Sequence, residues 1–184
     1  MSGGVQTTDV GPSLAHGLAR YVELFNQQPA AETLAASRLA GDLGSRRFRN
    51  RVAGSAAQKT FDTTIAAPGR EIPVRIHIPR GADSRPAIGY FHGGGFAHGT
   101  IESFSITSEA LAAESGRIVA SVQYRRLPES SFSDAQDDCI FAARWLFNHA
   151  ARLGAQSTKL TLAGDSVGAL FAFNTALALN REES

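Results

Sequence analysis

The chain has 184 residues, of which 43% are hydrophobic and 19% charged, with a formal net charge of +1. This length suits one ordinary domain, and the composition excludes disordered and fibrous proteins. The small net charge gives no reason to expect nucleic acid or an acidic membrane as a partner. Cys139 is the single cysteine, which excludes an internal disulfide and favours a reducing compartment. The opening residues lack the pattern of a signal peptide and no apolar run reaches membrane-spanning length, so we expect a cytoplasmic protein.

The first part of the chain is predicted to be helical. Apolar residues recur at spacings of three and four in residues 13–27 and 29–41, with Ser13 as a cap and Gly41 as a stop. Residues 42–58 lack clear periodicity and are interpreted as a linker. They hold a basic cluster, for which we favour a solvated surface over an anion site: Arg46, Arg47, Arg49 and Arg51.

From residue 59 onwards the pattern changes to strands. Two β-rich segments, KTFDTTIAA at 59–67 and IPVRIHIP at 72–79, are separated by Pro68-Gly69 and predict an antiparallel pair. Further apolar runs of strand length alternate with helical patterns. The strands are expected at 87–91, 117–124 and 159–164, and the helices at 101–116, at 134–154 and after Ser166. This alternation predicts an α/β fold with a mostly parallel, twisted sheet, in which ligands bind at the carboxyl ends of the strands.

The segment LAGDSVGAL follows the last expected strand. Glycines at 164 and 168 leave room for a sharp strand-to-helix turn that exposes Ser166, as in a G-x-S-x-G nucleophile elbow. The amide of Val167 would then face an oxyanion. Taken alone the pattern is weak, since a glycine-rich turn with no chemistry fits it as well.

A second glycine motif, His92-Gly93-Gly94-Gly95, directly follows an earlier strand. Three successive glycines cost conformational entropy, but they bring backbone N–H groups against a ligand with no side chain in the way. Such amides stabilise the negative charge of an acyl-transfer transition state. A phosphate cradle is the competing interpretation, and the absence of Lys-Ser/Thr after the glycines argues against it.

The blocks HGGGF, YRRLPESSFSDAQDDCIFAARWL and GDSVGA together resemble the hormone-sensitive-lipase-like branch of α/β-hydrolase carboxylesterases. The resemblance runs from about residue 60 to the C-terminus. It implies Ser166 as nucleophile and Gly94, Gly95 and Val167 as oxyanion donors. It also implies His92, Gly93 and Asp165 as support for the loop. Val167 departs from the alanine usual in the family. The residues that match as structural positions are Tyr124, Arg125, Pro128, Glu129 and Asp138.

The resemblance further implies a division into N-terminal cap helices and linker at 1–58 and a hydrolase core at 59–184. It also implies a small ester substrate, with no metal or organic cofactor. An Arg125 ion pair with either Glu129 or Asp138 is expected, and the sequence does not choose between the two.

No histidine follows Ser166, although α/β-hydrolases place their acid and histidine after the serine. Among the histidines that precede it, His98 is a candidate for lining the pocket. We therefore expect an incomplete α/β-hydrolase fold, the N-terminal part of an esterase whose Asp and His lie outside this chain. Such a chain would be weakly active or inactive, with an exposed sheet edge open to self-association. A non-catalytic binding protein on the same scaffold and a truncated product without function are the alternatives.

Overall fold

The computed structural model describes residues 32–49, 57–81 and 85–182. Its helices and strands follow in the order α2 (Leu34–Arg49), β1 (Ala57–Ala67), β2 (Arg70–Pro79), β3 (Pro86–Phe91), α3 (Ser105–Ser115), β4 (Val119–Val122), α4 (Phe132–Leu153), β5 (Gln156–Gly164) and α5 (Val167–Glu182). The described residues from Arg38 onwards form one compact unit. The first expected helix, at 13–27, lies outside the described residues.

One five-stranded sheet has the order β1-β2-β4-β3-β5. β1 and β2 form the expected antiparallel hairpin across Pro68-Gly69, and β2 pairs antiparallel with β4. β3 pairs parallel with both β4 and β5. The mixed, partly parallel sheet confirms the predicted α/β class.

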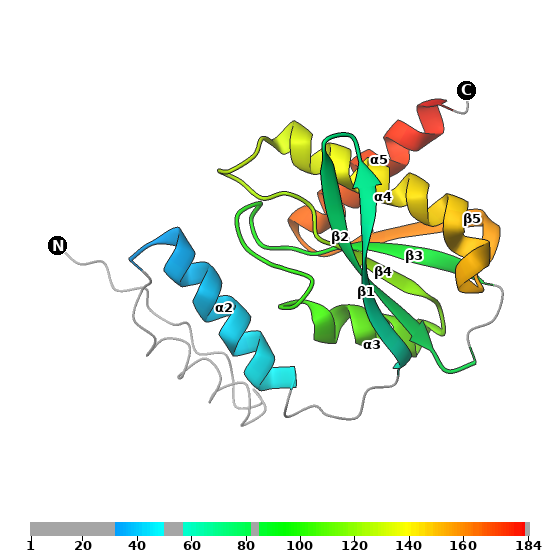
Figure 1. Cartoon of the computed structure of the whole chain (residues 1–184), viewed down its shortest axis with the longest axis horizontal. Helices are drawn as coiled ribbons and strands as arrows, with labels where there is room; N and C mark the ends of the chain where they lie inside the picture. The colour runs from blue at the N-terminus through cyan, green and yellow to red at the C-terminus, as the bar shows by residue number, and fades with distance from the viewer. Residues whose placement is uncertain (1–31, 50–56, 82–84, 183–184) are drawn as a thin grey trace, which may run out of the picture. The chain divides into compact units, whose positions relative to one another are not determined.

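Helices cover both faces of the sheet (Figure 1). Along β3, Ala87 and Phe91 face the larger core beneath α4 and α5, whereas Ile88 and Tyr90 face a smaller core beside α3. This alternation follows from the period of two along a strand. Because both faces are buried, the run AIGYF is apolar throughout, as a central strand of this kind requires.

α2 differs from the expectation. The helix does not stop at Gly41 but continues to Arg49, so that part of the expected linker is helical. A helical glycine costs about 1 kcal/mol relative to alanine, which contacts elsewhere in the fold can outweigh. Arg46, Arg47 and Arg49 fall in the last turns of α2, and Arg51 lies outside the described residues.

Two further features of the described residues bear on function. No helix among them has the length and apolar character needed to cross a bilayer. Cys139 is buried in the core, and burial raises the pKa of its thiol. Packing against the core, as expected for a cysteine within α4, therefore accounts for this residue.

Candidate active site

The two glycine motifs meet at one edge of the sheet. β3 and β5 are parallel neighbours, and Phe91 at the end of one pairs with Gly164 at the end of the other. A Cβ at Gly168 would collide with the carbonyl oxygen of Phe91 and approach that of His92. The elbow and the His92 loop are therefore in direct backbone contact, and glycine at 168 is what permits it.

Ser166 lies in the turn between β5 and α5. Its φ of 50° is in the left-handed region, which is unusual for a residue with a side chain. The turn is closed by the Gly168 amide, which donates to the Asp165 carbonyl at 2.8 Å, and by the Ala169 amide, which donates to the Ser166 carbonyl at 3.1 Å. Ser166 is exposed, and its hydroxyl makes no hydrogen bond within the part of the chain that the structure describes.

Asp165 joins the elbow to the glycine loop. Its Oδ1 accepts hydrogen bonds from the Gly93 amide at 2.9 Å and from the Tyr90 hydroxyl at 2.7 Å. Burial and the bond to Asp165 raise the pKa of Tyr90 well above its usual range, so this phenol remains a donor. Because Asp165 engages the Gly93 amide, that amide is not one of those turned towards a ligand.

The loop after Gly93 has an unusual backbone. Gly94, Gly95 and Phe96 have φ values of 125°, 58° and 65°, three positive angles in succession. A Cβ at Gly94 would collide with the backbone of His98, so glycine is required there. The amides of Gly94 and Gly95, and that of Val167 at the start of α5, donate no hydrogen bond to any described residue. These three amides are the ones expected to face an oxyanion.

His92 is fully buried beneath the loop. Its ring stacks on Tyr124 at 4.4 Å and on Phe104 at 5.4 Å between ring centroids, and its Nδ1 lies 2.7 Å from the Gly93 carbonyl oxygen. Burial lowers the pKa of His92 to about 4, so the ring is neutral and Nδ1 carries the proton that it donates to Gly93. His92 thus contacts the loop from beneath, and the supporting role that the resemblance implies for it stays a prediction.

The other described histidines lie in different surroundings. His77 is buried between Thr60 and Ser108, and His149 stacks on Trp145 along α4. His98 lies in the loop itself, where its amide donates to the Gly94 carbonyl at 2.8 Å. No hydrogen bond joins any of these rings to Ser166 in the described structure. The expectation that the general base is not among these histidines stays a prediction.

Two residues near the site carry roles that sequence patterns did not reveal. Tyr90 holds Asp165 across a separation of 75 residues, and Arg38 contacts the carbonyl of Ala97, which is 59 residues away. No local periodicity links such distant partners, so no signal in the sequence could have found them. The Arg125 ion pair is resolved as well: its Nε donates to Asp138 Oδ2 at 2.9 Å, while Glu129 pairs with Arg38.

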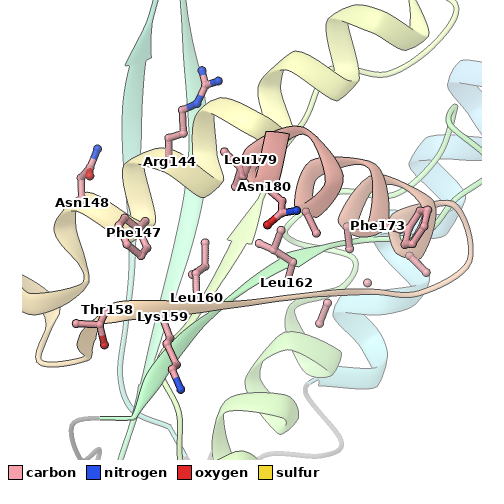
Figure 2. Close-up of a pocket in the computed structure, with 15 residues that line it drawn as sticks. Arg144, Phe147, Asn148, Thr158, Lys159, Leu160, Leu162, Phe173, Leu179 and Asn180 are labelled. Carbon is pink, nitrogen blue, oxygen red and sulfur yellow. The ribbon is translucent and has the colours of Figure 1, made fainter. Parts of the chain in front are cut away.

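A groove of about 960 Å³ runs along β5 between α4 and α5, on the side that carries no further strand of the described sheet (Figure 2). Neither Ser166 nor Gly93–Gly95 lines it. Its lining is mostly apolar and includes Phe147, Leu160, Leu162, Ala169, Phe173 and Leu179. The groove therefore exposes core-type surface beside the elbow.

Comparison with known proteins defines the family. Residues 88–184, more than half of the chain, match a family described as having the alpha/beta hydrolase fold. The chain belongs to this family. Its similarity to human hormone-sensitive lipase, 39% identity over 94 residues covering 51% of this chain and 9% of the lipase, places it in the hormone-sensitive-lipase-like branch of the α/β-hydrolases.

The relatives of this α/β-hydrolase are named as esterases. An ethyl acetate hydrolase of Pseudomonas putida is 33% identical over 182 residues, covering 92% of this chain and 57% of the relative. A crystal form of an esterase from Pyrobaculum calidifontis superposes with a TM-score of 0.79 at 31% identity, covering 89% of this chain and 54% of that one. The family is thus one of carboxylic-ester hydrolases, and the chain spans little more than half the length of these relatives.

Proposed function

We propose that this α/β-hydrolase acts on carboxylic esters of small molecules through Ser166. The observation that carries the proposal is the backbone contact between the two glycine turns. One turn holds an exposed serine with a left-handed backbone, and the other holds amides that donate no hydrogen bond to any described residue. Support also comes from the esterase names of the relatives. Substrates with acyl chains of modest length follow from the family resemblance.

In the proposed mechanism, Ser166 Oγ attacks the ester carbonyl and its proton passes to a general base. The Gly94, Gly95 and Val167 amides stabilise the oxyanion, each contributing about 2.7–4 kcal/mol to the transition state. Collapse of the tetrahedral intermediate expels the alcohol, which takes up the proton, and leaves an acyl-serine. Water then adds to this ester and releases the acid and Ser166.

We assign the base and its orienting acid to residues outside this chain, as the order Ser, acid, His in the fold implies. Without them, Ser166 retains only the contribution of the oxyanion donors, which in a serine hydrolase is about 10³–10⁴-fold over water. The 184-residue chain by itself should therefore be weakly active, and activated esters are the substrates on which this would be measurable.

A non-catalytic ligand-binding protein on the same scaffold is the second candidate. It is favoured by one observation, the absence of a hydrogen bond from any described histidine to Ser166. In that case the glycine amides would bind a carboxylate or a carbonyl group without forming a covalent bond.

A cytoplasmic location remains a prediction from the single cysteine.

Labelling with a fluorophosphonate probe separates the two functions. Because the general base is assigned to residues outside this chain, we expect the probe to modify Ser166 slowly, through the oxyanion donors alone, and the Ser166→Ala variant to lose this modification, as followed by peptide mass spectrometry. Ser133→Ala, which removes an exposed serine of α4, is the matched control and should label like the parent. Equal labelling of the parent and Ser166→Ala would contradict the esterase proposal.

The groove along β5 supports a further part of the proposal, self-association through the outer edge of the sheet. An unpaired strand edge offers N–H and C=O groups to another chain, and an apolar groove beside it favours burial. A second copy could pair its own β5 there.

A further inference from the structure

The loop that carries the glycine amides makes few backbone hydrogen bonds of its own. The Gly94 carbonyl accepts from the Ala97 and His98 amides at 3.2 and 2.8 Å, and this closes one tight turn. A backbone with three successive positive φ angles persists only when surrounding groups hold it in place. The carbonyls at the far end of the loop, those of Ala97 and Gly99, accept instead from arginine side chains.

Arg38 of α2 makes four hydrogen bonds at this point. Its Nε donates to the Ala97 carbonyl at 2.6 Å and its Nη2 to the Leu127 carbonyl at 2.8 Å. The guanidinium also forms a bidentate pair with Glu129, at 2.6 and 3.0 Å. The side chain of Arg38 is only 14% exposed, whereas that of Glu129 is 62% exposed. The planar fork of an arginine suits this arrangement, because one rigid group reaches two carbonyls and a carboxylate.

Asp42 contacts the same loop from the same helix. The Thr100 hydroxyl donates to Asp42 Oδ1 at 3.0 Å. Residues four apart in a helix lie on one face, so Arg38 and Asp42 together contact the segment 97–100 from one side. Arg126 completes the set with a bond from Nη1 to the Gly99 carbonyl at 3.1 Å.

Surface ion pairs contribute little to stability, and the Arg38–Glu129 pair has an exposed carboxylate. The bonds from Arg38 to the two carbonyls are different in kind. The bond to Ala97 fixes backbone two residues from Gly95, and the bond to Leu127 fixes a residue whose amide donates to the Phe96 carbonyl at 3.1 Å. A change at Arg38 should therefore alter the loop far more than it alters the sheet.

We propose that Arg38 is a positioning residue for the oxyanion loop, residues 93–99. Together with the contact from Asp42 to Thr100, it holds the loop so that the Gly94 and Gly95 amides keep their orientation. Arg38 touches no reacting atom and acts through the Ala97 carbonyl. The inference rests on the proposed function for the loop's role, but the loop's order can be measured without any catalysis.

Amide hydrogen exchange of the full chain, followed by mass spectrometry, tests the proposal. In Arg38→Ala, the segment 93–99 should exchange about tenfold faster or more, since a hydrogen bond to a charged donor is lost. The strands at 86–91 and 159–163 should exchange as in the parent. Arg117→Ala, which removes an arginine that contacts Thr161, is the control and should leave the loop unchanged. Unchanged exchange of 93–99 in Arg38→Ala would overturn the proposal.

Two conservative variants separate loop positioning from charge. Glu129→Gln leaves the two carbonyl bonds of Arg38 intact, so the loop should exchange like the parent; acceleration equal to that of Arg38→Ala would overturn the proposal. Arg38→Lys keeps the positive charge but lacks the planar, forked guanidinium, so it should accelerate amide exchange in residues 93–99 and nowhere else. If Arg38→Ala accelerates exchange throughout the chain, the variant has lost its fold and the test passes to Arg38→Lys. In that case, exchange of residues 93–99 in Arg38→Lys at the parent's rate would overturn the proposal.

Fluorophosphonate labelling provides a second, functional measurement. Labelling of Ser166 should be about tenfold slower in Arg38→Ala and unchanged in Glu129→Gln, in proportion to the loss of loop order. A parent chain that labels no faster than Ser166→Ala would overturn the proposed function while leaving the exchange result intact. If Arg38→Ala exchanges the amides of residues 93–99 faster but labels Ser166 at the parent's rate, the positioning role would be overturned.

Discussion

Ser166 combines two properties that a purely structural turn residue seldom needs. Its side chain is exposed, and its backbone has a φ of 50°, which costs an L-residue about 1–2 kcal/mol relative to its relaxed conformations. Glycine would occupy this position without that penalty. Strain of this kind concentrates at functional sites, where the surrounding structure enforces it. At this elbow the enforcing contacts are those of Gly164 and Gly168 with the end of β3.

Two substitutions at Ser166 separate the cost of its left-handed backbone from the reactivity of its hydroxyl. Ser166→Gly should be more stable than Ser166→Ala by about 1 kcal/mol, because both lack the hydroxyl but only glycine relieves the left-handed conformation. Urea denaturation of the two variants measures the difference. Both should lose fluorophosphonate labelling. A Ser166→Ala protein at least as stable as Ser166→Gly would show that the backbone at 166 is not strained.

At the scale of elements, a buried histidine joins the β1–β2 hairpin to α3. His77 of β2 lies between Thr60 of β1, at 3.0 Å, and Ser108 of α3, at 2.9 Å. Burial lowers the pKa of His77 to about 4, while the Glu109 carboxylate opposes this shift. The neutral ring is therefore the form that the folded chain requires.

The pH dependence of stability follows from this depressed pKa. The folded pKa of His77 is about 4 and the unfolded value about 6.5, so the unfolded chain binds more protons between these values. Stability should therefore be retained above pH 7 and fall as the pH drops. His77 should account for about 2 kcal/mol of the loss between pH 7 and pH 5. Urea midpoints at both pH values test this. His77→Gln should show a smaller decline, whereas a decline equal to the parent's would contradict the assignment; His149→Gln is the control.

The start of α4 offers a second prediction at this scale. Ser131 caps the helix by accepting from the Asp134 amide at 3.1 Å, and its own amide donates to Asp134 Oδ2 at 2.9 Å. Ser131→Ala should cost about 1 kcal/mol of unfolding free energy, because one helix-end amide loses its acceptor. Ser133→Ala, two residues into α4, should change it by much less. Equal effects of the two variants in chemical denaturation would argue against the cap.

For the whole molecule, the outer edge of β5 is the main consequence of the fold. Within the described sheet β5 pairs only with β3, and the apolar groove beside it is bordered by α5, where Phe173 is 62% exposed. The solved esterase to which the chain is similar extends well beyond the matched part, since the chain covers 54% of it. Apolar surface of this extent favours association.

Self-association through this face is directly measurable. Sedimentation equilibrium of the 184-residue chain should show a mass that rises with concentration. Phe173→Lys should weaken the association about tenfold or more, because it places a charge in the groove. Glu71→Lys, an exposed change on β2, should leave it unaffected. A chain that stays monomeric, or a Phe173→Lys variant that associates like the parent, would contradict this part of the proposal.

Much of the fold was predictable because its signals are local. The hairpin at Pro68-Gly69, the apolar strands and the helices after them follow from short-range periodicity and turn residues, and the structure confirms them. The stop expected at Gly41 was wrong. The preference of glycine against a helix interior, about 1 kcal/mol, was overridden there. Arg38 and Asp42, on either side of Gly41, contact the glycine loop, and no pattern near Gly41 indicates these long-range contacts.

The sequence by itself determined the class of fold, the family and the two glycine motifs, since each is identified from short segments whose own residues are neighbours in the chain. Tertiary structure alone decided which partners hold those motifs together: Asp165 with Tyr90 and Gly93, and Arg38 with Ala97. These partners lie 59 to 75 residues apart. Hydrogen bonds across such separations depend on how strands and helices pack, and packing leaves no periodic trace along the chain.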